Sequence, residues 1–330
     1  MIKSFRAAAL AALTVLAGFH ADAQVRATDF PGKPINVVVG YPAGGPTDAL
    51  MRALAPRLAS EWKQPIVIDN RPGANEAIAA QFVARAQPDG HTLLLATEVP
   101  LTLNPHLMSG LKYDPQKDFA PVSLLLRSPL ALVVPQSSPA KSLKDFIALA
   151  KSRSSAGPLA YASAGPGGVL HLPMAMLAKQ NGVDMTHVPY KGVAPLLTDV
   201  ASGQVDAAWV AVAGAAPLIR DGRIRALVVG APSRVKALPE VPTFAEAGVA
   251  PVQADFVFAL LAPAGTPPAV AEKIASAIRK IMAEPEFRDK NLDPFGYVMV
   301  ASSPAELGRY IAQDRATQAE RVKVAGVKME

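Results

Sequence analysis

Short apolar runs alternate with segments of helical periodicity along nearly the whole chain, and this alternation restricts the fold more than any other feature. We expect strands at 35–40, 66–69, 92–96, 121–126, 130–134, 159–162, 186–188, 206–210, 225–229 and 256–261. We expect helices at 46–61, 74–87, 142–152, 168–181, 193–202, 214–221, 267–283 and 304–324, with a kink at Pro56 in the first of them. This order of elements is typical of an α/β fold with a mostly parallel sheet.

The first 23 residues have the three parts of a secretory signal peptide. A basic start, MIKSFR, precedes the apolar run AAALAALTVLAGF and an A-x-A motif at residues 21–23. The apolar run is shorter than the roughly 20 residues that span a membrane, and no cysteine is present to carry a lipid anchor. We therefore expect cleavage before Gln24 and export of a soluble protein to the periplasm.

The charge and the cysteine content limit the possible partners. The chain of 330 residues has a formal net charge of +6, and loss of Lys3, Arg6 and Asp22 with the signal peptide lowers it by one, to +5. The basic residues are spread out, which mildly favours anionic ligands and argues against a nucleic-acid partner. With no cysteine, the fold must be stabilised by its core and not by disulfides.

Two glycine-rich segments lie where a predicted strand leads into a predicted helix. The first is VGYPAGGPTD at 39–48, and the second is SAGPGG at 163–168. The first N–H groups of a helix have no partner within it and can bind an anion, and ligands of open α/β sheets lie beyond the carboxyl ends of the strands. Four to six donors at roughly 1.5–3 kcal/mol each could supply the about −8 kcal/mol of micromolar binding. The alternative for each loop is a plain turn between a strand and a helix.

Neither loop completes a nucleotide-binding motif. The first has the Gly40-x4-Gly45 spacing of a phosphate-binding loop, but Pro46-Thr47 stands where Lys-Ser/Thr is required. The second has Leu170 in place of the third glycine of GxGxxG. We therefore expect no nucleotide and no cofactor.

A serine hydrolase is a weaker alternative. Ser163 lies in YASAG, where Tyr161 replaces the first glycine of the G-x-S-x-G motif, so the sharp turn of that motif is not specified. An exported hydrolase would have to use Ser163 with His171 or His187. The histidines show no metal-ligand spacing, and His171 is of interest only because it closely follows the second glycine loop.

The two loops also belong to a set of ordered segments that resembles a known family. These segments are FPGKPINVVVGYPAGGPTD, IDNRPGA, ARAQPDGHTLLLAT, YDPQKDFAPVSLL, LAYASAGPGG, HVPYKG, SGQVDAAW, LPEVPTFAEAG and LAPAGTP. With them the chain resembles the Bug-type receptors of the tripartite tricarboxylate transporter family over nearly its whole mature length. The resemblance implies a type II periplasmic binding protein fold with two α/β lobes, a small organic acid between them, a membrane permease as partner and no catalysis. We expect a monomer.

The resemblance also implies the lobes and the ligand contacts. Lobe 1 would comprise 24–128 and 256–330, lobe 2 would comprise 129–255, and the crossing strands would match 130–134 and 256–261. The expected ligand-binding residues are Tyr41, Gly44, Gly45, Pro46, Thr47, Asp48, Thr97, Glu98, Ser163, Ala164, Gly165, Gly167, Gly168, His171, Tyr190, Lys191 and Val210.

Three departures from the family pattern bear on the ligand. Asn75-Glu76-Ala77 replaces the usual Gly-Gly-Asn, Thr97-Glu98 replaces a small Ser/Gly turn, and Val210 stands where a second aspartate is common. If Glu98 faces the cleft, we expect it to disfavour a second carboxylate and to favour an amine or amide. Alternatively, Glu98 points to solvent. Trp209 and Val210 would either form an apolar wall for an aromatic acid or belong to the core.

We therefore predict a periplasmic receptor that captures a small organic carboxylate, or a related amide, and delivers it to a permease. Closure of the lobes around the ligand would be what the permease detects. Two alternatives are a receptor that presents its ligand to a membrane sensor kinase and the exported hydrolase described above.

Overall fold

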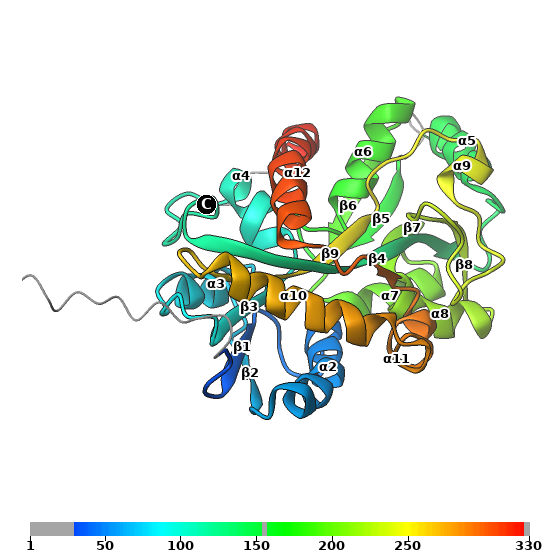
Figure 1. The fold of residues 1–330 in the computed structure, drawn as a ribbon. Coiled ribbons are helices and arrows are strands. Elements are labelled where there is room, and N and C mark those ends of the chain that lie inside the picture. The colour runs from blue at the N-terminus through cyan, green and yellow to red at the C-terminus, as the bar shows by residue number, and fades with distance from the viewer. Residues whose placement is uncertain (1–29, 154–156, 327–330) are drawn as a thin grey trace, which may run out of the picture.

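The computed structural model describes residues 30–153 and 157–326, so the predicted signal peptide lies outside the described residues. Its strands form one ten-stranded sheet with the order β2-β1-β3-β9-β4-β7-β5-β6, in which β10 and β8 also pair with β4 (Figure 1). Their bounds are β1 Ile35–Val39, β2 Ile66–Asn70, β3 Thr92–Ala96, β4 Phe119–Pro135, β5 Leu159–Ser163, β6 Met185–Pro189, β7 Ala207–Ala211, β8 Ile224–Val229, β9 Asp255–Pro263 and β10 Val298–Met299.

The helices cover both faces of this sheet. They are α2 Pro46–Trp62, α3 Ala77–Ala84, α4 Asn104–Leu107, α5 Leu143–Arg153, α6 Leu172–Asn181, α7 Val193–Ser202, α8 Val212–Arg220, α9 Phe244–Ala247, α10 Pro268–Ala283, α11 Pro285–Asn291 and α12 Pro304–Ala325. A π-helical turn, η2, spans Val99–Leu103, and a 3₁₀ turn, η3, spans Asp293–Phe295. Among the described helices, none is both long and apolar enough to cross a membrane.

Alternation along the strands produces the two core layers of the first half of the sheet, which we call lobe 1. Val37 and Val39 of β1 pack with α2 and α10 on one face, whereas Val38 packs with α3 and α12 on the other. Strands β3 and β9 alternate in the same way, as the period of two of a strand requires. Figure 1 shows α10 and α12 on opposite sides of β4 and β9.

The second half, lobe 2, repeats this three-layer design around β8, β4, β7, β5 and β6. Leu130, Leu132 and Val134 of β4 pack with α5, α6 and α9. The intervening Ala131 and Val133 pack with α7 and α8 on the opposite face. Each lobe is therefore an α/β sandwich with its own core, and the predicted fold class is confirmed.

Two long strands connect the lobes. Strand β4 is continuous from Phe119 to Pro135; it pairs with β9 up to Pro129 and with β7 and β8 from Leu130 onward. The prediction of two separate strands, 121–126 and 130–134, was wrong: residues 127–129, the predicted gap, stay paired with residues 255–257 of β9, so the strand does not end there. The chain returns through β9, which lies between β3 and β4. The lobe boundary at 128/129 stays a prediction.

The sheet is mixed and not mostly parallel, which corrects a second expectation. Strands β1–β3 and β5–β7 pair in parallel through β1 and β5, whereas every pairing of β4 and β9 is antiparallel. Strands β4 and β9 are antiparallel to each other because one leads from lobe 1 to lobe 2 and the other returns.

The predicted helices are present, with two informative changes at their starts. The helix expected from residue 74 begins at Ala77, because Ala74, Asn75 and Glu76 all have positive φ. The helix expected from residue 168 begins at Leu172, after the turn formed by the second glycine loop. Pro56 lies inside α2, which continues to Trp62. Short elements such as η2, α4, α9 and α11 were not predicted.

Candidate functional site

The first glycine loop ends at the N-terminus of α2 with unpaired polar groups. Gly45 is the N-cap and Pro46 the first helical residue, and no side chain caps this end. The N–H groups of Thr47 and Asp48 have no acceptor within the described residues. The Thr47 side chain is 2 % exposed and its Oγ1 is unpartnered, as is Oδ1 of Asp48. Buried polar groups are nearly always paired in proteins, so this end of α2 is suited to receive a ligand.

The remaining bonds of Asp48 fix the shape of the loop. Its Oδ2 accepts the Gly44 N–H at 2.8 Å and Nε of Arg52 at 2.8 Å. The hydrogen bond from Arg52 is the main reason that the pKa of Asp48 lies below its ordinary value. Gly44 has φ +84°, a left-handed conformation that favours glycine. Asp48 is therefore a carboxylate that organises the loop, with one oxygen left free.

A buried acidic cluster lies next to this loop. Glu76 accepts the Thr97 N–H at 3.0 Å through Oε2 and the Thr97 hydroxyl through Oε1. The Tyr41 side chain lies next to Glu76 and Thr97. Burial raises the pKa of Glu76 to about 7 and, as the main cause, raises that of Tyr41 well above its ordinary value. The structure thus joins Tyr41 and Thr97, two predicted site residues, through a glutamate that the sequence identified only as a departure.

The second glycine loop presents a similar row of donors ahead of α6. The His171 and Leu172 N–H groups bond back to the Gly168 carbonyl at 2.9 and 3.1 Å. The N–H groups at 168–170 have no acceptor among the residues that the structure describes. The Gly165 N–H is held by Ser163 Oγ at 3.1 Å, and the Gly167 N–H by Nδ1 of His171 at 2.9 Å. This loop is therefore a second place where consecutive backbone donors are free.

Three stacked aromatic rings lie next to the second loop. His171 stacks on His187 with ring centroids 4.0 Å apart, and His187 stacks on Tyr161 at 5.1 Å. Burial, followed by repulsion from His187, lowers the pKa of His171 to about 4. Burial also lowers the pKa of His187. Neutral rings can stack without charge repulsion. His171 acts on the loop through its Nδ1, which accepts the Gly167 N–H.

One contact in the structure favours the hydrolase alternative. Ser163 Oγ lies 2.7 Å from Nε2 of His187, but it also lies 2.8 Å from the Gly165 carbonyl, its only other acceptor. The Ser163 residue is fully buried, and within 30–153 and 157–326 no carboxylate bonds to His187. A base oriented by a third group is the usual requirement for an activated serine. The observed bonds serve the shape of the loop.

A chain of contacts links the two loops. Thr97 Oγ1 accepts the Val99 N–H at 3.2 Å at the start of η2. Val99 packs in one cluster with Leu172 of α6 and Val322 of α12, and Val169 of the second loop packs against this cluster. The segment after β3 therefore lies between the loops, and α12 lies beside α6 (Figure 1).

The predicted contacts at the end of β6 lie on the same side of lobe 2. The Tyr190 N–H donates to the Ser163 carbonyl at 2.8 Å, so the PYKG segment adjoins the second loop. The Tyr190 hydroxyl donates to Asp199 of α7 at 2.6 Å, and this hydrogen bond is the main cause that raises the pKa of Tyr190 to about 12. Lys191 is exposed.

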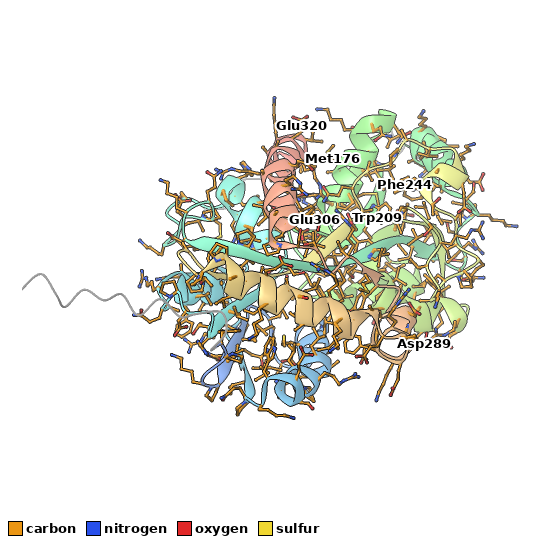
Figure 2. The ribbon with its side chains drawn as sticks, viewed as in Figure 1. Met176, Trp209, Phe244, Asp289, Glu306 and Glu320 are labelled. Atoms are coloured by element: carbon orange, nitrogen blue, oxygen red, sulfur yellow. The ribbon has the colours of Figure 1, made fainter. Side chains whose placement is uncertain are left out.

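Trp209 and Val210 belong to the core of lobe 2. Trp209 is fully buried and stacks on Phe244, with ring centroids 6.0 Å apart, and Figure 2 labels both residues in lobe 2 (Figure 2). Val210 is also fully buried, packed on the opposite face with α7 and α8. The alternative of an apolar wall is therefore wrong for Trp209, and the described contacts give no support to a ligand contact by Val210.

Of the two positions predicted for Glu98, the structure excludes the solvent-facing one, and the cleft-facing one stays a prediction. Glu98 is 1 % exposed, so the solvent-facing alternative is wrong. Its Oε2 accepts the N–H of Val257 in β9 at 2.9 Å, whereas the preceding Thr97 points to Glu76. The two side chains diverge because the chain leaves β3 in extended form, where neighbouring side chains alternate. The acidic group beside the glycine loop is thus Glu76.

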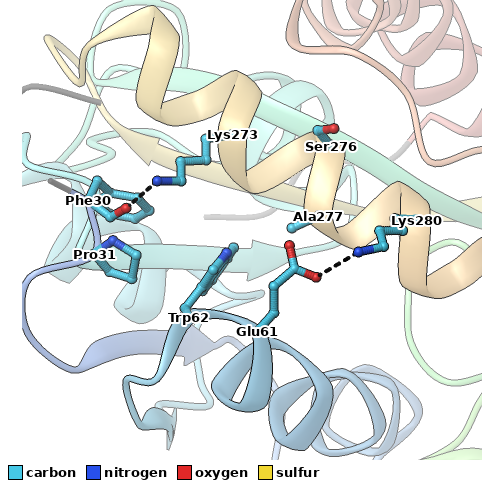
Figure 3. A pocket seen from close by; sticks show the side chains of 8 residues that line it. All are labelled: Phe30, Pro31, Glu61, Trp62, Lys273, Ser276, Ala277 and Lys280. Atoms are coloured by element: carbon cyan, nitrogen blue, oxygen red, sulfur yellow. Dashed lines mark hydrogen bonds and ion pairs between the residues drawn. The ribbon is translucent and has the colours of Figure 1, made fainter. Parts of the chain in front are cut away.

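The pocket in Figure 3 lies elsewhere on lobe 1. It holds about 530 Å³ between the C-terminal end of α2 and α10, and Lys273 and Lys280 cross it to the Phe30 carbonyl and to Glu61 (Figure 3). None of its lining residues is a predicted site residue. It is separated from Thr47 by nearly the full length of α2.

Comparisons with known proteins identify the family and agree with the fold. A family model described as the tripartite tricarboxylate transporter family receptor matches residues 50–326. The periplasmic binding protein BugD is 30 % identical, with a TM-score of 0.75 over 91 % of this chain and 100 % of its own. A protein of R. palustris, Rpa4515 with adipate, is 33 % identical, with a TM-score of 0.79 over 92 % of this chain and 100 % of its own. MatC from Rhodopseudomonas palustris with bound malate is also 33 % identical, with a TM-score of 0.73 over 89 % and 100 %.

Proposed function

Because the chain belongs to the tripartite tricarboxylate transporter receptor family, of Bug type, we propose that it captures a small organic carboxylate or a related amide. The ligand is held between the two glycine loops in the periplasm and is then delivered to a membrane permease. The chemistry is binding alone: the ligand leaves unchanged.

The unpaired donors at the start of α2 carry this proposal. Thr47 offers a free N–H and a buried, unpartnered hydroxyl, and Asp48 offers a second free N–H. These donors need an acceptor, and a carboxylate oxygen meets the partial positive charge of the helix N-terminus. The free N–H groups at 168–170 face the same requirement on lobe 2.

Related proteins support carboxylates as the ligand class. The R. palustris relatives hold adipate and malate, which are both organic acids with carboxylate ends. Because of the departures at Glu76 and Thr97-Glu98, neither of these two acids is carried over to this chain, and its own ligand must be identified by experiment. A thermal-shift screen of the mature protein against organic acids and their amides identifies it, since a ligand at a hundredfold excess over Kd stabilises by about 2.7 kcal/mol.

Thr47→Val is expected to weaken binding of the acid found in that screen by about tenfold or more. The change keeps the shape but removes the hydroxyl, and a hydrogen bond to a charged group contributes roughly 1.5–3 kcal/mol, where 1.4 kcal/mol is tenfold. Isothermal titration calorimetry of the two proteins measures the ratio. Thr198→Val is the matched control, because Thr198 is an exposed residue of α7 whose hydroxyl bonds to the Ala194 carbonyl. Equal affinities of Thr47→Val and wild type would show that the N-terminus of α2 does not contact the ligand.

Delivery is tested separately from capture. Deletion of the permease genes is expected to abolish uptake of the ligand by cells, because the receptor alone cannot move a solute across the membrane. Intact uptake together with a lost transcriptional response on receptor deletion would favour the sensor-kinase alternative.

A further inference from the structure

Glu76 is a buried carboxylate placed over the ends of two parallel strands of lobe 1. A Cβ added at Gly40, which follows β1, would lie 2.8 Å from Cβ and Cγ of Glu76 and 3.0 Å from its Oε2. Both carboxylate oxygens bond to Thr97, which follows β3. Since β1 and β3 are parallel neighbours, Glu76 lies beyond their carboxyl ends, where ligands of such sheets bind.

The backbone that carries Glu76 is strained. Ala74, Asn75 and Glu76 have φ values of +47°, +50° and +66°, a left-handed conformation that side chains disfavour and glycine adopts freely. Nδ2 of Asn104 donates to the Asn75 carbonyl at 2.9 Å and helps to hold this turn. Such outliers persist where the surroundings enforce them, and they concentrate at ligand sites. The turn suits glycine at residue 76, and yet it carries a desolvated carboxylate.

No cation neutralises this carboxylate in the part of the chain that the structure describes. It accepts hydrogen bonds from the Thr97 N–H and the Thr97 hydroxyl, and Tyr41 lies next to it. An ionised carboxylate offers about four acceptor positions, so it can still accept from a further donor. A second carboxylate brought beside it would meet a like charge in a medium of low dielectric, whereas an amide N–H or an ammonium group would meet an acceptor.

We infer that Glu76 determines the selectivity of the ligand site: it excludes a second carboxylate from the position beside its own carboxyl group and admits monocarboxylates whose other end is an amide or an amine. The inference rests on the proposed function, because it needs a carboxylate held by the glycine loops. From the sequence, Glu98 was expected to disfavour a second carboxylate. The inference gives this role to Glu76, which lies beside the first loop.

The test uses matched pairs of ligands on the mature protein at pH 8, where Glu76 is ionised. The probes are succinate with succinamate, adipate with its monoamide, and terephthalate with terephthalamate, so that each pair differs only in the charge of one end. Calorimetry is expected to show the monoamide binding at least tenfold more tightly than its diacid. In Glu76→Gln, which keeps the shape and one acceptor, this ratio is expected to fall below about threefold.

Two further variants separate selectivity from folding. Glu76→Gly fits the backbone at φ +66° and is therefore expected to fold, and it should also lose the preference for the monoamide. Glu240→Gln is the matched control, because it makes the same change at an exposed glutamate outside both glycine loops, and it should keep the wild-type ratio.

The outcomes are distinct. Monoamide-to-diacid ratios that are the same in wild type, Glu76→Gln and Glu76→Gly would overturn the inference and leave the receptor function standing. Tighter binding of the diacids to wild type would also overturn it. If none of the acids binds to wild type, the proposed function fails, and the inference fails with it.

Discussion

Gly230→Ala is expected to lower the free energy of unfolding by more than about 3 kcal/mol or to prevent folding. A Cβ at Gly230 would lie 2.0 Å from the Ala254 carbonyl oxygen and 2.6 Å from its Cβ. Overpacking of side chains usually costs 1–3 kcal/mol, and here the obstacle is backbone that cannot change rotamer. The Gly230 N–H donates to the Leu130 carbonyl at 2.8 Å, and the Leu130 N–H donates to Ala254 at 2.9 Å. The added methyl group would therefore separate the end of β8 from the residue that precedes β9, next to the point where β4 enters lobe 2.

Urea denaturation of Gly230→Ala beside Gly214→Ala measures this effect. Gly214 lies in α8, and nothing is found within 4 Å of a Cβ added there. Alanine in an exposed or open helical position is expected to stabilise by about 0.5–1 kcal/mol. A loss below about 1 kcal/mol for Gly230→Ala would mean that Gly230 and Ala254 can move apart without disturbing the core of either lobe. The effect of the substitution would then have to be sought in ligand affinity.

The sequence was sufficient for the elements that pattern alone determines. Parallel strands such as β1 and β5 are apolar runs that end in glycine-rich turns, and α10 and α12 have long amphipathic repeats, so each was placed within a few residues. The long strand β4 was divided wrongly because Pro129 resembles a strand end when its register partner is unknown. The short elements η2 and α9 depend on tertiary contacts and have too few residues to show a period.

In the candidate site, the free backbone donors could be located from the sequence, whereas the orientation of the buried glutamates could not. Thr47 and the second loop follow from a glycine turn before a helix, a local feature. Glu76 and Glu98 could not be distinguished in this way, because their positions depend on which of Gly40 and Val257 lies opposite each side chain. One sequence signal for Glu76 existed: a glutamate in a turn where glycine is usual implies a costly backbone conformation. Where the Glu76 side chain points could be learned only from the structure.

Glu98 makes the stability of the protein depend on pH. Its carboxyl lies between η2, β9 and α12: Oε2 accepts the Val257 N–H, Oε1 has no partner in the described region, and Asp314 and Asp255 add negative charge nearby. Burial, opposed by the bond from Val257 and aided by those two carboxylates, raises the pKa of Glu98 from 4.5 to about 8. The folded protein therefore keeps a proton on Glu98 that the unfolded chain has already lost.

The sign of the effect follows from this difference in bound protons. A carboxyl whose pKa is raised by folding contributes its full stability below about pH 4.5, and this contribution is lost as the pH rises to about 8. His171, whose pKa is lowered to about 4, acts in the opposite direction, but only below its unfolded value of about 6.5. Between pH 6.5 and 8 the histidine contribution is therefore constant, and the slope of Glu98 is about 1.4 kcal/mol per pH unit.

Glu98→Gln is accordingly expected to gain about 2 kcal/mol in free energy of unfolding relative to wild type between pH 6.5 and 8. The amide keeps the acceptor for the Val257 N–H and cannot ionise in either state, so only the wild type loses stability over this range. Urea denaturation at four pH values measures the two slopes, and Glu240→Gln, at an exposed position, should follow the wild type. Glu76→Gln should show a smaller gain that ends near pH 7, because burial raises the pKa of Glu76 only to about 7. Parallel curves for Glu98→Gln and wild type would show that Glu98 is ionised in the fold, with Arg321, the buried cation of α12, as the group that its charge would then require.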